Sequence, residues 1–204
     1  MDSNRYIELM KQVSRKILIL NGSPQGTKGN CAAVIKLLNK KYQLQSNVLS
    51  LTEKPSFEKI KKHLIQADGF IFVTGTYWDS WGSPLQYFLE TVTPLEGSSA
   101  FLGKPCSVLV LNHSVGGKGV LSRLQGVLST LGCLIPPMSG WVYSLTTELL
   151  FKQKKNQPQA DDFWSLQDLD IVIQNLQTSL SLSVDWKSWP VDRKNFKATW
   201  LKTQ

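Results

Sequence analysis

Three segments of the sequence combine glycines with hydroxyl, amide or aromatic side chains, which are groups that bind anions and flat rings. The first segment, residues 22–30, reads GSPQGTKGN. Its glycines let several backbone N–H groups converge, and the helix expected after it adds the positive end of a helix dipole. The segment therefore predicts a loop that binds a phosphate group. A glycine-rich connection without a ligand is the alternative for this loop taken alone.

This first loop departs from two common nucleotide-binding patterns. It does not close with the Gly-Lys-Ser/Thr sequence of a P-loop, and it lacks the G-x-G-x-x-G fingerprint of dinucleotide-binding proteins. The loop therefore argues against an ATPase and against a Rossmann-type dehydrogenase.

The second segment, residues 74–82, reads TGTYWDSWG and is unusually aromatic for a loop. Loops at strand ends mostly carry small polar residues, so a tyrosine and two tryptophans there indicate a flat ring to be bound. The alternative is that Trp78 or Trp81 packs in the core or at an interface, and we expect this of at least one of them.

The third segment, residues 112–119, reads NHSVGGKG and again leads into a helix. Its backbone N–H groups and Lys118 are suited to stabilise negative charge. His113 is a candidate acid or base, although a lone histidine is more often structural. No paired carboxylates, Ser-His-Asp arrangement or cluster of metal ligands stands out, so the sequence predicts neither a catalytic side chain nor a metal site.

Each of the three segments follows a short apolar run that is typical of a strand buried on both faces. Helical patterns, with apolar residues recurring every three or four positions, alternate with these runs. The expected strands are 16–21, 47–51, 69–74 and 107–112, with a fifth within 133–144. The expected helices have apolar faces within 31–38, 57–65, 85–92, 121–131 and 166–180, with Ser83 as a candidate N-cap and Gly132 as a candidate C-cap.

This alternation predicts an α/β protein, a doubly wound three-layer α/β/α sandwich around a five-stranded parallel sheet. We expect residues 1–184 to form this domain with a short N-terminal extension, and residues 185–204 to form a C-terminal extension. The extension carries Trp186, Trp189 and Trp200, which we expect to pack on their own subunit or a partner, with a lid over the ligand as the alternative. Ligands bind beyond the carboxyl ends of such strands, where the three segments fall.

The composition is that of an ordinary globular protein, with 42% hydrophobic and 19% charged residues. No apolar run has the length of a membrane span and the start does not resemble a secretory signal, so we expect a cytoplasmic protein. Cys31, Cys106 and Cys133 include no C-x-x-C pair, which favours reduced thiols. The net charge of +8 is spread over scattered lysines without a nucleic-acid-binding motif, so we expect an anionic small molecule and not nucleic acid.

Two stretches resemble a known family. Residues 17–30, ILILNGSPQGTKGN, are similar to the opening strand and FMN-phosphate loop of the NADPH-dependent FMN reductase family, and residues 72–80, FVTGTYWDS, resemble its second signature. The resemblance extends over about residues 16–140. It implies a flavodoxin-like fold and an FMN-dependent NAD(P)H oxidoreductase that passes hydride through bound FMN to a flavin, quinone or similar acceptor.

The resemblance also implies site residues, which fall into three groups. The phosphate of FMN would be held by Ser23, Gln25, Gly29, Asn30 and Cys31. The ribityl chain and ring would be bordered by Thr76, Tyr77, Trp78, Asp79 and Ser80, and the other ring edge by Asn112, Ser114, Gly116 and Gly117. The chain differs from the family at Gln25, where Arg is frequent, at Cys31, where Ser or Thr is frequent, and at Gly75, where Pro is common.

By the same resemblance, NADPH or NADH is the co-substrate, the acceptor is a small molecule, and the protein forms a homodimer or homotetramer. No acid–base residue is required, because the flavin does the chemistry. A flavodoxin-like binding module without turnover, namely an electron carrier, a sensor or a degenerate family member, is the main alternative. The charge of +8 argues against the carrier, since carrier flavodoxins are typically acidic.

Overall fold

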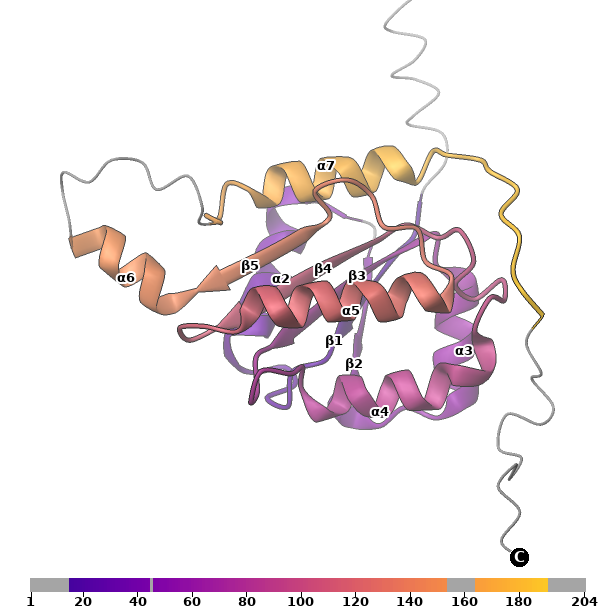
Figure 1. The fold of residues 1–204 in the computed structure, drawn as a ribbon, viewed down its shortest axis with the longest axis horizontal. Coiled ribbons are helices and arrows are strands. Elements are labelled where there is room, and N and C mark those ends of the chain that lie inside the picture. The colour runs from indigo at the N-terminus through magenta and orange to yellow at the C-terminus, as the bar shows by residue number, and fades with distance from the viewer. Residues whose placement is uncertain (1–14, 45, 154–163, 191–204) are drawn as a thin grey trace, which may run out of the picture.

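The computed structural model of the chain describes residues 15–44, 46–153 and 164–190 (Figure 1). A sheet of five parallel strands runs through its centre in the order β2-β1-β3-β4-β5. The strands are β1 (Ile17–Asn21), β2 (Ser46–Ser50), β3 (Gly69–Gly75), β4 (Cys106–Asn112) and β5 (Gly140–Ser144). Every residue of β1 and β3 is buried, which explains why both read as continuous apolar runs.

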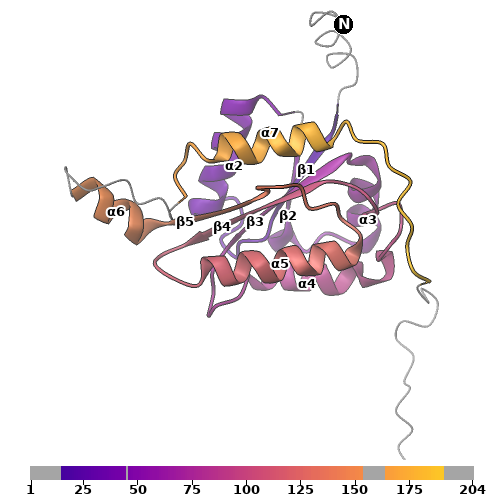
Figure 2. The same cartoon turned by 45° about the horizontal axis from the view of Figure 1, so that its top comes forward.

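Helices cover both faces of the sheet. They are α2 (Gly29–Tyr42), α3 (Phe57–Gln66), α4 (Ser83–Val92), α5 (Gly117–Leu131) and α7 (Leu169–Ser179). The helices α2 and α7 lie on one face, and α3, α4 and α5 lie on the other (Figures 1 and 2). Short 3-10 turns, η1 (Leu51–Glu53) and η2 (Thr93–Leu95), follow β2 and α4. A further helix, α6 (Leu145–Gln153), continues from β5 and projects away from the three layers (Figure 2).

Each face of the sheet has its own apolar cluster, because side chains alternate along a strand. On β1, Leu18 belongs with Phe72 to the cluster under α3, α4 and α5, whereas Ile19 belongs with Ile35 of α2 and Leu176 of α7 to the other. All five side chains are buried. The two clusters fix the helices over the sheet, so the loops that join strand ends to helix starts are held in place.

The strand order reverses between β1 and β3, since β1 connects outward to β2 while β4 and β5 follow on the far side of β3. This doubly wound order has its switch point between the carboxyl ends of β1 and β3. The predicted α/β fold, a flavodoxin-like three-layer sandwich with a five-stranded parallel sheet, is confirmed. The first two of the three glycine-containing loops leave the sheet at this switch point.

Some local expectations are wrong. Gly82, and not Ser83, is the N-cap of α4, because the carbonyl of Gly82 accepts the first hydrogen bonds of the helix. Ile65 is 49% exposed, and Leu166, at 41%, lies before α7 begins, so neither belongs to a buried helix face. Residues 145–153 form α6, where no helix was expected.

An extended stretch, residues 181–190, follows α7 and passes the edge of the sheet where β3 and β4 begin (Figure 1). Trp186 of this stretch lies against Gly103, and Trp189 Nε1 donates to Glu96 Oε1 at 2.9 Å. Both tryptophans therefore pack on their own subunit, which was one of the expected outcomes. Trp200 lies outside the described residues.

Candidate functional site

A cavity of about 550 Å³ opens at the carboxyl ends of β1, β3, β4 and β5. Its wall includes a first set of the predicted site residues: Ser23, Gln25, Asn30, Cys31, Thr76, Tyr77 and Asn112. A second set does not line it: Gly29, Trp78, Asp79, Ser80, Ser114, Gly116 and Gly117. The cavity therefore joins the first two loops at the switch point and reaches the start of the third loop.

The side chain of Asn21, the last residue of β1, forms hydrogen bonds with the backbone of the first loop. Asn21 Nδ2 donates to the Gly26 carbonyl at 2.6 Å, and Asn21 Oδ1 accepts from the Ser23 N–H at 3.1 Å. Ser23 is buried, and its Oγ accepts from the Gln25 N–H at 3.3 Å. The loop is thus held as a compact turn whose outer residues face the cavity.

The N-terminus of α2 follows this turn and carries no side-chain cap. Lys28 occupies the N-cap position, and its side chain makes no hydrogen bond to the first turn of the helix. Gly29 has a φ of 79°, which favours glycine, and a Cβ there would lie 1.7 Å from Gln25 Oε1. The exposed Gln25 amide therefore lies against the start of α2, where the positive end of the helix dipole favours an anion.

Cys31 lies in the first turn of α2 and is buried. Burial raises the pKa of its thiol to about 11, and a hydrogen bond with Ser23 opposes this only in part. The side chain is therefore a neutral thiol at neutral pH, in contrast to the lowered pKa that a helix N-terminus can give a cysteine.

The second loop ends in a tight turn that carries its aromatic residues in opposite directions. Tyr77 and Ser80 exchange backbone hydrogen bonds of 2.8 and 3.0 Å, and Trp78 and Asp79 between them have positive φ values of 49° and 55°. Trp78, at the tip, is fully exposed. Tyr77 instead folds back over Gly75, and its hydroxyl lies 3.5 Å from Ser23 Oγ across the cavity.

Trp81, which follows the turn, packs against the apolar cluster under α4 and α5. Its Nε1 donates to Gln86 Oε1 at 2.9 Å, and the Arg123 guanidinium lies 6.0 Å from its ring centroid. Arg123 also donates to the Asp79 carbonyl. The expectation that at least one of the two loop tryptophans packs in the core is therefore met by Trp81, while the turn that contains Asp79 is tied to α5.

Two residues of the cavity wall each carry a buried oxygen atom without a hydrogen-bond partner. Within the described residues, the buried side-chain atoms that lack a hydrogen-bond partner are Thr76 Oγ1, Ser107 Oγ and Asn112 Oδ1. Thr76 directly follows β3, and Asn112 is the last residue of β4. Both residues line the cavity, whereas Ser107 lies inside the sheet. Buried polar atoms are normally satisfied, so the pair at the cavity indicates room for a polar ligand.

The start of the third loop approaches these atoms closely. Asn112 Nδ2 donates to the Val115 carbonyl at 3.3 Å, and a Cβ on Gly117 would lie 2.8 Å from Asn112 Oδ1. Gly116 has a φ of 87° and approaches the Asp79 carboxylate. His113 lines the cavity, and its backbone carbonyl accepts two hydrogen bonds from Thr146.

One wall of the cavity was missed in the sequence analysis. It consists of Tyr143 from β5 together with Leu145, Glu148 and Leu149 from α6. The spacing of the two leucines is that of one helix face, which was the only available signal. Neither described tryptophan of the C-terminal stretch lines this cavity, so the lid expected as an alternative is not formed by Trp186 or Trp189.

The described residues contain neither a cluster of metal ligands nor a helix that could span a membrane. They contain no group of three or more His, Cys, Asp or Glu side chains that could hold a metal ion. None of the helices in the same part of the chain has the length and apolar character that crossing a membrane requires.

Comparisons with known proteins agree with this fold. The model of the NADPH-dependent FMN reductase family matches residues 15–147. RosB, solved with bound 8-demethyl-8-formylriboflavin-5'-phosphate, is similar with a TM-score of 0.64 and 12% identity over 93% of this chain and 96% of that chain. No match to the sequence was found among curated proteins.

Two further solved structures are similar at comparable identity. The apo form of EMOB, an NADH:FMN oxidoreductase, has a TM-score of 0.58 and 17% identity over 84% of this chain and 91% of that chain. A flavodoxin from Pseudomonas aeruginosa has a TM-score of 0.55 and 18% identity over 81% of this chain and 98% of that chain. These likenesses establish the fold.

Proposed function

Because the chain belongs to the NADPH-dependent FMN reductase family, we propose that it is an FMN-dependent oxidoreductase that takes hydride from NADPH or NADH and passes electrons to a flavin, quinone or similar acceptor. The observation that carries the proposal is that two residues of the cavity wall, Thr76 and Asn112, each carry a buried oxygen without a partner, Thr76 Oγ1 and Asn112 Oδ1. A flavin ring carries polar groups along its edge that can form hydrogen bonds with such oxygen atoms. The residues present therefore fit the cofactor.

We propose that the phosphate of FMN binds at the start of α2. Backbone N–H groups there are not capped by Lys28, and the loop brings hydroxyl and amide groups to the same place. The residues assigned to the phosphate are Ser23, Gln25, Gly29, Asn30 and Cys31. The Gln25 amide ends an exposed, flexible side chain, so it can move aside or donate to the phosphate itself.

We propose that the ring lies between the second and third loops. The second loop contributes Thr76, Tyr77, Trp78, Asp79 and Ser80, and the third contributes Asn112, Ser114, Gly116 and Gly117. Thr76 and Asn112 are the assigned direct contacts, since both residues line the cavity and each carries an oxygen without a hydrogen-bond partner. Tyr77 also lines the cavity, and the remaining residues of the two loops are assigned to the entrance of the binding site, because they lie outside the cavity wall.

When bound, FMN supplies the hydride acceptor and passes the electrons on. The chain's own residues orient the ring and exclude water. Tyr77 and Leu149 wall the cavity on two sides, and the N-terminus of α5 directs its positive end toward the ring edge, where it stabilises negative charge. No side chain is assigned a proton-transfer role.

The exposed Lys28 and Lys118 are the proposed contacts for the phosphates of NADPH or NADH, because Arg123 is already bound to the Asp79 carbonyl. We further propose a homodimer or homotetramer and a cytoplasmic location. These last proposals rest on the sequence and the family.

A non-catalytic flavin-binding module, or a family member that no longer binds flavin, is the second candidate function. It is favoured by the position of Gln25, whose side chain lies against Gly29 where the phosphate would bind. It is also favoured by Tyr77, which extends across the cavity toward Ser23.

The experiment is an absorbance spectrum of the full chain incubated with FMN, recorded before and after anaerobic addition of NADPH. Flavin bands at about 375 and 450 nm that bleach quickly are the expected result. Bands that persist with both NADPH and NADH would favour the binding module. No bound flavin at all would overturn the proposal.

A matched pair of variants tests the assigned contact. Asn112→Ala removes a free oxygen at the cavity, and we expect FMN affinity to fall about tenfold. Ser107→Ala removes a free oxygen that lies inside the sheet, away from the cavity, and we expect FMN affinity to stay within about twofold. Equal losses in both variants would argue against the assigned position of the ring.

A further inference from the structure

Two cysteines meet at the opposite edge of the sheet, where β4 begins. The backbone of residues 104–106 pairs with residues 133–135: the Cys106 N–H donates to the Leu134 carbonyl and the Leu134 N–H to the Lys104 carbonyl, both at 2.9 Å. Pro105 and Leu134 form a parallel bridge. Side chains alternate along paired strands, so Cys106 and Cys133 lie on the same face, opposite to that of Pro105 and Leu134.

The two cysteine side chains are neighbours on this face and belong to one apolar cluster. A hydrogen bond with Cys133, followed in importance by burial, raises the pKa of Cys106 well above its usual value. Both sulfurs belong to the apolar cluster under α5, and the cysteines of the described chain form no disulfide. The pair is therefore a reduced dithiol that joins the start of β4 to the turn after α5.

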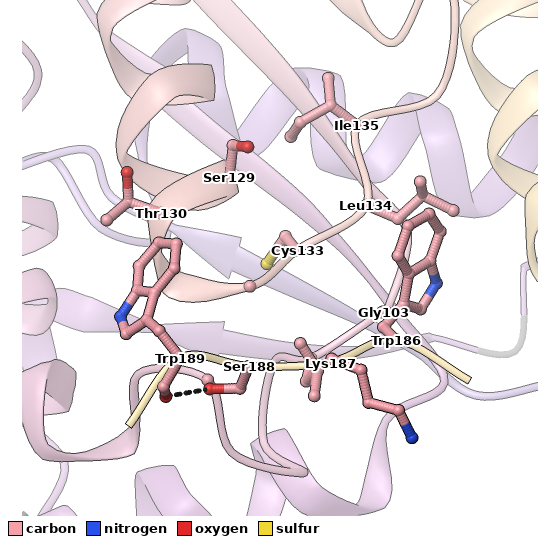
Figure 3. Close-up of a pocket in the computed structure, with 13 residues that line it drawn as sticks. Gly103, Ser129, Thr130, Cys133, Leu134, Ile135, Trp186, Lys187, Ser188 and Trp189 are labelled. Carbon is pink, nitrogen blue, oxygen red and sulfur yellow. Dashed lines mark hydrogen bonds between the residues drawn. The ribbon is translucent and has the colours of Figure 1, made fainter. Parts of the chain in front are cut away.

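The two thiols differ in access to solvent. Cys106 is completely buried, whereas Cys133 lines an open cavity of about 370 Å³. Figure 3 shows Cys133 between Trp189 and Trp186 of the C-terminal stretch, whose indoles form opposite sides of the cavity. A small reagent in this cavity meets Cys133, which is 6% exposed, whereas Cys106 does not line the cavity.

We propose that Cys133 and Cys106 are a redox-active pair that hydrogen peroxide oxidises to an intramolecular disulfide. Cys133 Sγ, as the thiolate, attacks the peroxide, the O–O bond breaks, and hydroxide leaves with the thiol proton as water. This leaves a sulfenic acid on Cys133. Cys106 Sγ then attacks that sulfur, the S–O bond breaks, and a second water leaves. The dithiol loses two protons and two electrons, and the peroxide is reduced to two molecules of water.

The order of the steps follows from the burial of the two sulfurs. Cys133 is the first thiol to react because it is the one at the cavity, and Cys106 resolves the intermediate because it is the neighbouring thiol on the same face. Cys31, the third cysteine, lies in the other apolar cluster, on the opposite face of the sheet. It therefore cannot take part without unfolding, which makes it the internal control. This proposal does not depend on FMN.

The test treats the reduced, native full chain with hydrogen peroxide and blocks remaining thiols by alkylation before mass analysis. We expect loss of two hydrogen atoms, a single cross-link between the peptides that contain Cys106 and Cys133, and an unmodified Cys31. Dithiothreitol should restore the original mass. Trp186 and Trp189 should lose fluorescence on oxidation and regain it on reduction, because both line the cavity at Cys133.

Variants separate the two roles. Cys133→Ser should abolish the cross-link and leave Cys106 reduced, whereas Cys106→Ser should let a trapping reagent capture the sulfenic acid on Cys133. Cys31→Ser should form the cross-link as the original chain does. Should either variant fail to fold, the peptide map of the original chain decides alone. Over-oxidation of Cys133 without a cross-link, or no reaction in the native protein, would overturn the proposal.

Discussion

The two edges of the parallel sheet differ in how completely their polar groups are satisfied. At the carboxyl edge, Thr76 Oγ1 and Asn112 Oδ1 have no partner. At the amino edge, Lys104 Nζ donates to the Leu64 and Ile65 carbonyls at 2.7 and 3.2 Å, and the backbone of Cys106 is paired with that of Leu134. Of the three unpartnered buried oxygens in the described residues, two therefore belong to the cavity wall at the edge where parallel sheets bind ligands, and the third, Ser107 Oγ, lies inside the sheet.

From this difference we expect the residues that bind FMN and the residues that stabilise the fold to lie at opposite edges of the sheet. Removing an unpartnered group of the cavity wall at the carboxyl edge should lower FMN affinity without destabilising the cofactor-free fold, while a disruptive substitution at the amino edge should destabilise the fold and leave FMN affinity unchanged. The following substitutions test that separation, beginning with the largest expected effect.

Gly132→Val should destabilise the protein by about 3 kcal/mol. Gly132 caps α5 with a φ of 110°, and a Cβ there would lie 3.2 Å from the Leu102 Cα. A β-branched residue is strained in that conformation and also meets the neighbouring backbone. Chemical denaturation of the cofactor-free chain measures the loss.

The control for this substitution is Gly126→Val in the same helix. A Cβ at Gly126 meets nothing within 4 Å, so stability should change by no more than about 0.5 kcal/mol. FMN affinity should be unchanged in both variants. A loss of affinity in Gly132→Val would show that the two edges are coupled and would contradict the separation.

Cys31 gives the carboxyl edge a pH-dependent contribution to stability. Burial raises the pKa of the folded thiol from 9.0 to about 11, so the unfolded thiol ionises first as pH rises. Stability from this group is complete below pH 9.0 and is lost between 9.0 and about 11, by about 2–3 kcal/mol in total. Denaturation curves across this range measure it.

Other groups titrate at the same pH, so the informative quantity is the difference between the original chain and Cys31→Ala. That difference should shrink as pH rises from 9.0 to about 11. A difference that is constant with pH would mean that the thiol is not protected by burial.

Thr76→Val should weaken FMN binding about tenfold and stabilise the cofactor-free chain by about 1 kcal/mol. The two effects have opposite signs because Thr76 Oγ1 has no partner in the protein and is assigned to the ligand. Titration of FMN fluorescence measures the first effect and chemical denaturation the second.

Thr74→Val, two residues earlier and within β3, is the matched control. Thr74 Oγ1 accepts from the Gly82 N–H and donates to the Gly75 carbonyl, both at 3.1 Å. Its removal leaves a buried N–H unsatisfied and should destabilise the chain by about 1–2 kcal/mol. Destabilisation by both valines would show that Thr76 is structural and would remove the strongest support for the ring position.

Sequence reasoning succeeded where a pattern depends on local periodicity. The buried strands β1 and β3 are continuous apolar runs, and Gly132 stops a helix because it is the residue that adopts positive φ most easily. The three loops were found for the same reason, since their glycines stand between such elements. The order of strands then placed the first two at the switch point.

The rest of the site depends on contacts between distant residues. Nothing local indicates that Arg123 binds the Asp79 carbonyl, or that Tyr143 and α6 form a wall of the cavity. The proximity of Cys106 and Cys133 likewise arises from the pairing at Pro105 and Leu134. Such contacts follow from tertiary packing, which no single sequence window contains.

The smallest effect is expected at Trp189, which fastens the C-terminal stretch to the amino edge. Trp189→Phe keeps most of the apolar area and removes the 2.9 Å hydrogen bond to Glu96, so stability should fall by about 0.5–1 kcal/mol. The stretch should then open more often and alkylation of Cys133 should become faster, while FMN affinity stays constant. Timed alkylation followed by peptide mapping measures the rate, with Cys31 as the internal reference. If Cys133 reacted at the original rate, the stretch would not control access to the thiol pair, and the amino edge would owe its closure to the packing of Trp186 against Gly103 instead.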